Sequence, residues 1–181
     1  MLYIKNYLLS VTTLCLLSTP TLANAHLMVA EHGTLNFVDN NVFIVLSIPM
    51  SAFKGVDENK DGKISIVEFN AHKKQISKRV TKNVYLADHQ YKFTIDGLLL
   101  NPEASHTHKS DNIDQVTITG RYSMPSKLTK VNFNVKLFSN NEHKQHYQIT
   151  ATNKTQKLTH QFELSPTSPF SKVFNNTYLN N

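Results

Sequence analysis

The feature that most constrains the fold is a series of short runs in which apolar and polar residues alternate. In KVNFNVKLFS, residues 130–139, every second side chain from Val131 to Leu137 is apolar, and asparagine or lysine stands between them. Successive side chains of a strand point to opposite faces, so this alternation predicts a strand with one buried and one wet face. The other runs of this kind are NVYLAD, YKFTI, GLLLNP, DQVTITGRYSM, HYQITAT and KLTHQFELS.

Turn residues separate these runs at intervals of roughly ten residues, a spacing typical of antiparallel sandwiches. Two earlier runs, GTLNFVD and NVFIVLSIPM, flank Asp39-Asn40-Asn41 and predict a β-hairpin. Asp96-Gly97 predicts a further tight turn, between YKFTI and GLLLNP. The sequence therefore predicts a mainly β protein with the architecture of an antiparallel β-sandwich.

One α-helix is predicted near the start of this strand pattern. Phe69, Ile76 and Val80 recur at helical spacing, and Ser65 with Glu68 forms a capping-box pair before them. The same helix carries five basic residues, which we interpret as a solvated face rather than a patch for nucleic acid or anionic lipid. They are Lys73, Lys74, Lys78, Arg79 and Lys82.

The first 25 residues have the features of a cleaved secretory signal. Lys5 precedes an apolar run over residues 7–17, and the small residues Ala23 and Ala25 fit a cleavage site before His26. The run is too short to span a bilayer comfortably, and no later segment is long and apolar enough to do so. We therefore expect a periplasmic or secreted protein with no membrane span after signal removal.

Composition indicates one domain after this signal peptide (residues 1–25). The chain has 181 residues and is 40% apolar, enough for one core of ordinary size. Its single cysteine, Cys15, lies in the signal, which excludes disulfides and thiolate metal sites from the mature chain. We expect the sandwich domain over residues 26–165, with a loop and helix inserted at 57–82, and a flexible tail over 166–181.

The stretch DENKDGKISIVE, residues 57–68, gathers acidic side chains around one glycine. Calcium takes about six to eight oxygen ligands, so a short segment must wrap tightly around it. Gly62 permits the sharp bend, Ile64 should anchor the loop to the protein, and Glu68 can bind with both carboxylate oxygens. The predicted ligands are Asp57, Asn59, Asp61, the Lys63 carbonyl, Ser65 through water, and Glu68.

With this spacing, residues 57–68 resemble the calcium-binding loop of an EF-hand. EF-hands usually occur in pairs and have a long entering helix. Here the preceding segment SIPMSAFKGV contains Pro49 and Gly55, and no second acidic loop follows. These departures disfavour a sensor that opens a helix pair. We expect Ca²⁺ as a structural cofactor, bound with a dissociation constant of roughly 10⁻⁵ to 10⁻³ M.

Histidines provide a competing prediction, a transition-metal site. Cleavage before His26 would leave a free amine and an imidazole that together chelate copper or nickel. His106 and His108 lie in a polar segment, and His143 and His146 stand beside a predicted strand. Each pair can offer imidazoles to zinc, copper or nickel. The alternative function is therefore a periplasmic transition-metal carrier.

The wider pattern, HGTLNF followed by the acidic loop, a helix and strands, is similar to bacterial periplasmic domains associated with HupE/UreJ-type permeases for nickel and related metals. This resemblance implies an accessory role with a membrane metal permease as partner. The mature sequence has no GxSxG elbow, HExxH motif, phosphate-binding glycine loop or cysteine nucleophile. We therefore expect an exported calcium-binding accessory module rather than an enzyme.

Overall fold

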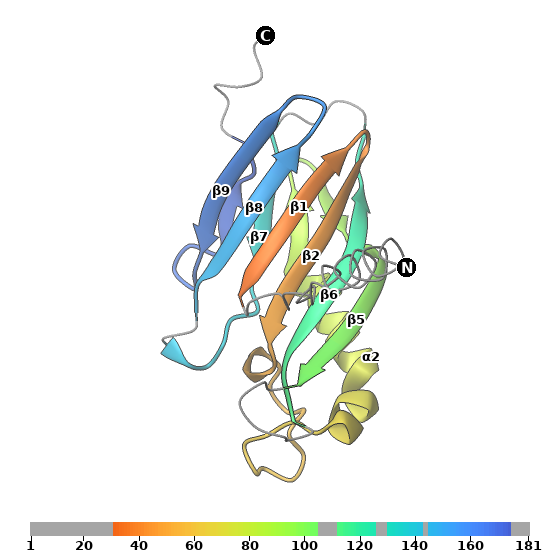
Figure 1. Cartoon of the computed structure of the whole chain (residues 1–181), viewed down its shortest axis with the longest axis vertical. Coiled ribbons are helices and arrows are strands. Elements are labelled where there is room, and N and C mark those ends of the chain that lie inside the picture. Colours follow the sequence, from red (N-terminus) through yellow and green to blue (C-terminus); the bar gives the residue numbers. More distant parts are fainter. Residues whose placement is uncertain (1–30, 105–111, 126–129, 143–144, 175–181) are drawn as a thin grey trace, which may run out of the picture.

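The computed structural model of the chain describes residues 31–104, 112–125, 130–142 and 145–174. These residues form two facing β-sheets and one α-helix, α2 (Ile66–Asn83), which lies at one side of them (Figure 1). A short 3₁₀ helix, η1 (Met50–Ala52), leads from the first sheet toward the acidic loop. The predicted mainly β sandwich with a single inserted helix is confirmed.

The larger sheet has six strands. Their order is β5 (Asp96–Ala104), β6 (Ile113–Ser123), β2 (Asn41–Pro49), β1 (His32–Val38), β8 (Tyr147–Asn153) and β9 (Leu158–Leu164). The smaller sheet has four strands, in the order β10 (Phe170–Lys172), β7 (Asn132–Val135), β3 (Val84–Ala87) and β4 (Lys92–Thr94). In Figure 1 the larger sheet lies in front of the smaller one.

The predicted first hairpin is confirmed, but the sheet is not wholly antiparallel. β1 and β2 pair in antiparallel register up to Val38 and Asn41, and Asp39 in the turn has φ 50°. On its other side β1 pairs with β8 in parallel, with Leu35 opposite Ala151. Alternation within a strand reports which face is buried and carries no information about the direction of a distant partner. The predicted antiparallel sandwich therefore contains a parallel pair, β1 with β8, that the sequence did not indicate.

Asp96-Gly97 is not the tight turn that the sequence predicts. β4 pairs with β3 in the smaller sheet, whereas β5 pairs with β6 in the larger one, so the chain changes sheets here. Gly97 has φ 63° and lies where the β5–β6 register shifts, between Asp96 and Leu99. A hairpin turn and a β-bulge both favour glycine at positive φ, so the dipeptide alone does not distinguish them.

Part of the segment expected to be a flexible tail, residues 166–181, belongs to the smaller sheet. β10 pairs with β7, placing Phe170 opposite Asn134, and Val173 is fully buried. The backbone N–H of Val173 also donates to the Val131 carbonyl over 2.9 Å. The three-residue strand is too short to show a period, which explains why the sequence did not predict it. Residues 175–181 lie outside the described residues.

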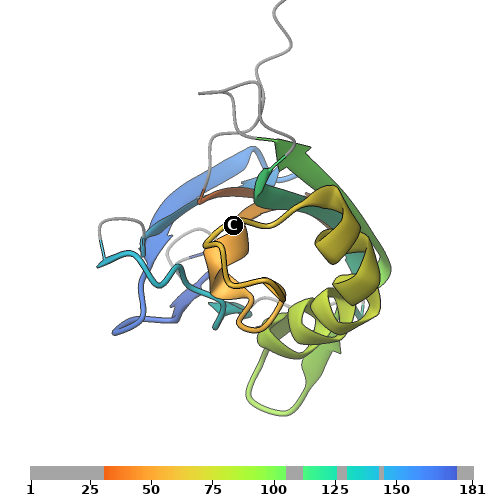
Figure 2. The ribbon, with the colours of Figure 1, turned by 90° about the horizontal axis from the view of Figure 1, so that it is seen from below.

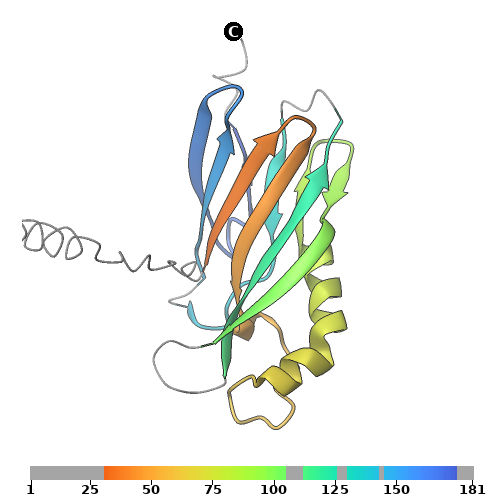
Figure 3. The ribbon, with the colours of Figure 1, turned by 45° about the vertical axis from the view of Figure 1, so that its right-hand side comes forward.

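Helix α2 closes one side of the sandwich. Its capping box at Ser65 and Glu68 is present as predicted, and Phe69, Ile76 and Val80 are all at most 1% exposed. These three side chains join the core formed by the inner faces of both sheets. Figures 2 and 3 show α2 beside β5, with the acidic loop below the end of the sandwich. The packing of α2 therefore sets where this loop lies.

Within the described residues, no helix has the length and apolar character needed to cross a membrane. The predicted signal peptide, residues 1–25, lies outside these residues.

Two buried tyrosines give a matched test of the core. The Tyr147 hydroxyl donates to the Leu137 carbonyl over 2.6 Å, whereas the Tyr122 hydroxyl is buried with no hydrogen-bond partner in the part of the chain that the structure describes. Tyr147→Phe should lower the free energy of unfolding by about 1–2 kcal/mol, because it leaves a buried carbonyl without a donor. Tyr122→Phe should be neutral or stabilising by up to about 1 kcal/mol. Urea unfolding of both variants checks this, and the reverse order would contradict it.

Candidate metal centre

The backbone of the acidic loop, residues 57–68, makes the tight bend that the sequence predicts. Gly62 has φ 78° and Lys60 has φ 59°, so two residues of the loop are in the left-handed region. Glycine adopts that region without the steric cost that a Cβ atom brings. The loop enters from Val56, which is fully buried, and leaves at Ile64, which is 8% exposed. Its two ends are therefore anchored while its tip is exposed (Figure 3).

Side-chain oxygens at the loop tip turn inward and accept backbone N–H groups. Asp57 Oδ2 accepts from the Gly62 N–H over 3.0 Å, and Asn59 Oδ1 accepts from the Asp61 N–H over 3.0 Å. Asp61 Oδ1 accepts from the Lys63 N–H over 2.8 Å, and its Oδ2 accepts from Asn59 Nδ2 over 3.2 Å. These bonds stabilise the bend. They leave lone pairs of the side-chain oxygens free to accept further bonds, because each carboxylate oxygen has two lone pairs.

Asp57 has one oxygen that these bonds leave unsatisfied. Its Oδ1 atom is buried and has no hydrogen-bond partner among the described residues, although Oδ2 is bonded to Gly62. A buried, unpaired carboxylate oxygen is costly, because it has lost its hydration without compensation. A cation or a donor at this atom would remove that cost.

Glu68 joins the loop to the start of α2. Its Oε2 accepts from the Ser65 N–H over 2.9 Å and from the Ser65 hydroxyl over 2.8 Å, and Oε1 accepts from the Glu58 N–H over 3.0 Å. The Ser65 hydroxyl oxygen in turn accepts from the Glu68 N–H over 3.2 Å. Led by the backbone and side-chain bonds from Ser65, these donors lower the pKa of Glu68 to about 2, against a smaller opposing effect of burial.

The predicted ligands therefore share one loop but do not all converge. Among the described residues, no three histidine, cysteine, aspartate or glutamate side chains form a group that could hold a metal ion. The reason lies in Glu68, both of whose oxygens are directed to backbone N–H groups of Ser65 and Glu58. A bidentate role for Glu68 would require these bonds to lengthen or exchange. Asn59 and Asp61 are bonded to each other across the bend, and Asp57 is bonded to Gly62.

The loop pairs with a strand of the sandwich where a paired EF-hand would offer a second loop. The Ile113 N–H at the start of β6 donates to the Ile64 carbonyl over 2.7 Å, and Ser65 forms an isolated bridge with Asn112. The predicted anchoring role of Ile64 agrees with this bond and with its burial. The start of β6 thus pairs with the acidic loop, in a chain whose sequence contains no second acidic loop that could do so.

His72 is a residue of this centre that the sequence analysis missed. Its Nε2 lies 2.8 Å from Glu58 Oε1, and its Nδ1 lies 2.9 Å from Gln75 Oε1. Both partners are acceptors, so they favour the doubly protonated imidazole. The hydrogen bond to Gln75, followed by the hydrogen bond to Glu58 and the charge of Glu58, raises the pKa of His72. The only sequence signal was its position one helical turn after Glu68, on the side of α2 that faces back to the loop.

Most of the histidines predicted as transition-metal ligands cannot be placed. His26, His106, His108 and His143 lie outside the described residues. His146 is exposed in the segment before β8. The transition-metal site stays a prediction from the sequence.

Comparison of the chain with known protein families finds no family model that matches it, and comparison with curated proteins finds no match. The function must therefore be argued from the loop and the surfaces of this molecule.

The depressed pKa of Glu68 predicts acid sensitivity. Its hydrogen bonds stabilise the fold fully above the usual carboxyl pKa near 4.5, and that contribution is lost as the pH falls toward about 2. Glu68→Gln should flatten the loss of unfolding free energy over this range, because glutamine still caps the helix but does not titrate. Urea unfolding across that pH range checks this. Glu163→Gln, at an exposed position on β9, should leave the pH profile unchanged.

The raised pKa of His72 predicts the opposite pH dependence. The protonated imidazole stabilises the fold below its ordinary pKa of 6.5, and this contribution is lost as the pH rises through the higher folded-state pKa. NMR titration of the His72 ring should show a midpoint above 6.5, and Glu58→Gln should lower it. A midpoint that does not move in Glu58→Gln, or one below 6.5, would contradict the pairing.

Proposed function

We propose that the acidic loop binds a calcium ion and that the ion fixes the loop and the start of α2 against the sandwich. The observation that carries this proposal is the Asp57 Oδ1 atom, which is buried at the first predicted ligand position and has no hydrogen-bond partner among the residues that the structure describes. The same loop has its glycine at positive φ and its last acidic residue in the first turn of α2. The residues that would hold the ion are Asp57, Asn59, Asp61, the Lys63 carbonyl, Ser65 and Glu68.

The donor set favours calcium over other divalent ions. All of the proposed donors are carboxylate, amide, hydroxyl or carbonyl oxygens, whereas zinc and copper prefer imidazole nitrogen and thiolate sulfur. Magnesium also takes oxygen but requires near-ideal octahedral geometry and releases its waters reluctantly. An irregular loop held partly by its own hydrogen bonds suits the more tolerant coordination of calcium.

Glu68 limits the affinity of such a site. It is the predicted bidentate ligand, but it also accepts the N–H groups of Ser65 and Glu58, so calcium competes with these bonds. Lys60 and Lys63 add positive charge to the loop. Both effects support a dissociation constant toward the weak extracellular end, roughly 10⁻⁵ to 10⁻³ M.

Such an affinity suits a protein that meets abundant calcium outside the cytoplasm, in line with the secretory signal that the sequence predicts. The ion would then act as structural support. At a calcium concentration ten times the dissociation constant, mass action adds about 1.4 kcal/mol to the free energy of unfolding. We propose an exported, calcium-supported binding module.

Calorimetric titration of the full chain with calcium tests the site. We expect saturable binding to one ion, a melting temperature that falls on addition of chelator, and loss of both effects in Asp57→Asn and Glu68→Gln. Glu163→Gln removes an equal charge far from the loop and should bind calcium normally.

A melting temperature that changes neither on addition of calcium nor on addition of chelator would refute the proposal. Binding that survives in both loop variants would place the ion elsewhere. Circular dichroism of each variant shows that a loss of binding is not a loss of fold.

A further inference from the structure

The outer face of the four-stranded sheet carries two rows of side chains that cross all four strands. Residues paired across neighbouring strands project from the same face of a sheet. The register therefore defines one row of Phe170, Asn134, Tyr85 and Thr94, and a second row of Lys172, Asn132, Ala87 and Lys92. The residues between them in β3 and β7 are core residues: Val84, Leu86, Phe133 and Val135.

This outer face is cationic and neither row contains an acidic residue. Lys92 Nζ lies 3.9 Å from the centroid of the Tyr85 ring, and Lys136 Nζ lies 6.0 Å from the same centroid. Lys92 Nζ also donates to the Lys82 carbonyl over 2.9 Å at the end of α2. The ring attracts both ammonium groups, and the carbonyl at the end of α2 also holds that of Lys92. Neither group neutralises them, so an anion here would gain from both charges.

The first row also contains an apolar ring, that of Phe170, and each row contains one asparagine amide. Phe170 is 56% exposed on β10 and lies opposite Asn134. An exposed aromatic ring of this size on a short edge strand contributes little to the core. Asn134 donates from Nδ2 to the Asn132 carbonyl over 3.3 Å and is only 9% exposed, so the half-buried Asn132 is the more accessible of the two amides. The face thus combines ring, amide and ammonium groups.

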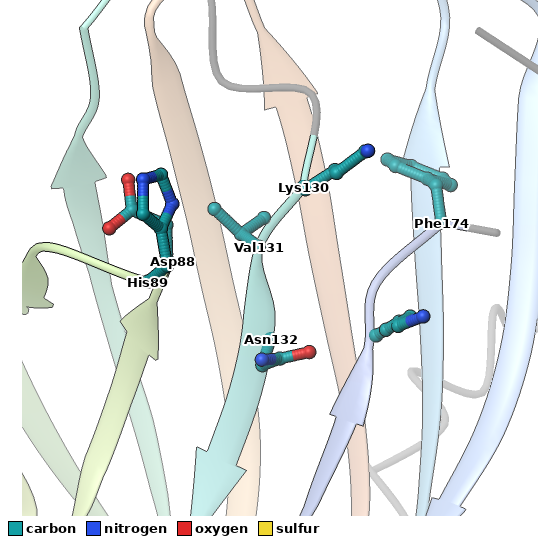
Figure 4. Close-up of a pocket in the computed structure, with 7 residues that line it drawn as sticks. Asp88, His89, Lys130, Val131, Asn132 and Phe174 are labelled. Carbon is teal, nitrogen blue, oxygen red and sulfur yellow. The ribbon is translucent and has the colours of Figure 1, made fainter. Parts of the chain in front are cut away.

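A hollow adjoins the second row at the end where β7 begins. Its volume is about 390 Å³, and Asn132 and Lys172 line it together with Lys130 and Phe174 (Figure 4). One acidic residue, Asp88, also lines the hollow, but its Oδ1 accepts the N–H groups of Gln90 and Tyr91 over 2.7 and 2.6 Å. The hollow therefore has two lysines in its lining, Lys172 of the second row and Lys130.

We propose that this outer face binds an acidic oligosaccharide. Carboxylates of the sugar would pair with Lys92, Lys136 and Lys172, one sugar ring would stack on Phe170, and a hydroxyl would bond to the Asn132 amide. Four strands span about 14 Å at about 4.8 Å between neighbours, which suits an extended ligand better than a single ion. This proposal is independent of calcium binding but rests on the predicted export, which makes glycans the accessible polyanions.

Calorimetric titration of the full chain with oligomannuronate, a uronic-acid oligomer, tests this. We expect saturable binding that weakens as salt is raised, and no binding of neutral malto-oligosaccharides of equal length. The triple variant Lys92→Gln, Lys136→Gln and Lys172→Gln should bind roughly tenfold more weakly or worse, since it removes three ion pairs. Phe170→Ala should also weaken binding, whereas Phe170→Tyr should retain it.

The matched control removes the same three charges from α2, in Lys73→Gln, Lys74→Gln and Lys78→Gln. It should bind oligomannuronate like the unaltered chain. Equal weakening in both triple variants, or equal binding of the neutral oligomer, would overturn the proposal. So would single-stranded DNA of equal length binding as tightly at the same residues. The titration is repeated in the presence of chelator. Because oligomannuronate binding is proposed to be independent of calcium, it should be the same with and without chelator, whether or not the loop binds calcium.

Discussion

The burial of one stripe of α2 determines where the two proposed binding regions of this protein lie. Phe69, Ile76 and Val80 are almost completely buried among side chains of both sheets, and each contributes about 1.5–3 kcal/mol through that burial. The acidic loop ends at the first turn of α2, and β3 begins directly after the last turn of α2. The buried stripe of α2 therefore positions both the loop and β3. The lysine-bearing face of β3, β4 and β7 is therefore linked to the loop through one rigid helix.

Glu68 has two roles that compete for the same atoms. As a capping residue it satisfies N–H groups of Ser65 and Glu58 that would otherwise lack partners. As the proposed calcium ligand it would present its oxygens to the ion. The helix start is therefore well formed without the ion, and bound calcium would add only the difference between the two arrangements. This competition is in line with the weak affinity proposed for the loop.

The sequence predicted local features of this fold well. Alternation placed β1 and β2 on either side of their turn, and the Ser65–Glu68 pair located the start of α2. Each of these features depends on residues a few positions apart, so a short window contains the physical cause. For the acidic loop, spacing alone predicted the bend at Gly62 and the anchoring of Ile64.

Features that depend on distant contacts were not predictable in this way. The parallel pairing of β1 with β8, the change of sheet at Asp96-Gly97 and the role of His72 each require knowledge of what lies alongside in space. The same limit applies to the loop itself, since spacing could not show that Glu68 bonds to the loop backbone. β10 was missed because its order comes from pairing with β7 and not from its own sequence.

The position of β1 has a consequence for how the chain folds. β1 lies inside the larger sheet, between β2, its neighbour in sequence, and β8, which is synthesised near the end of the chain. Until β8 arrives, β1 is an open edge with unpaired backbone groups, and such edges template association with other chains. Closing this sheet also requires a long-range contact, which slows folding. A chain in which β8 has not yet paired therefore presents the backbone groups of β1 to any other unpaired strand nearby.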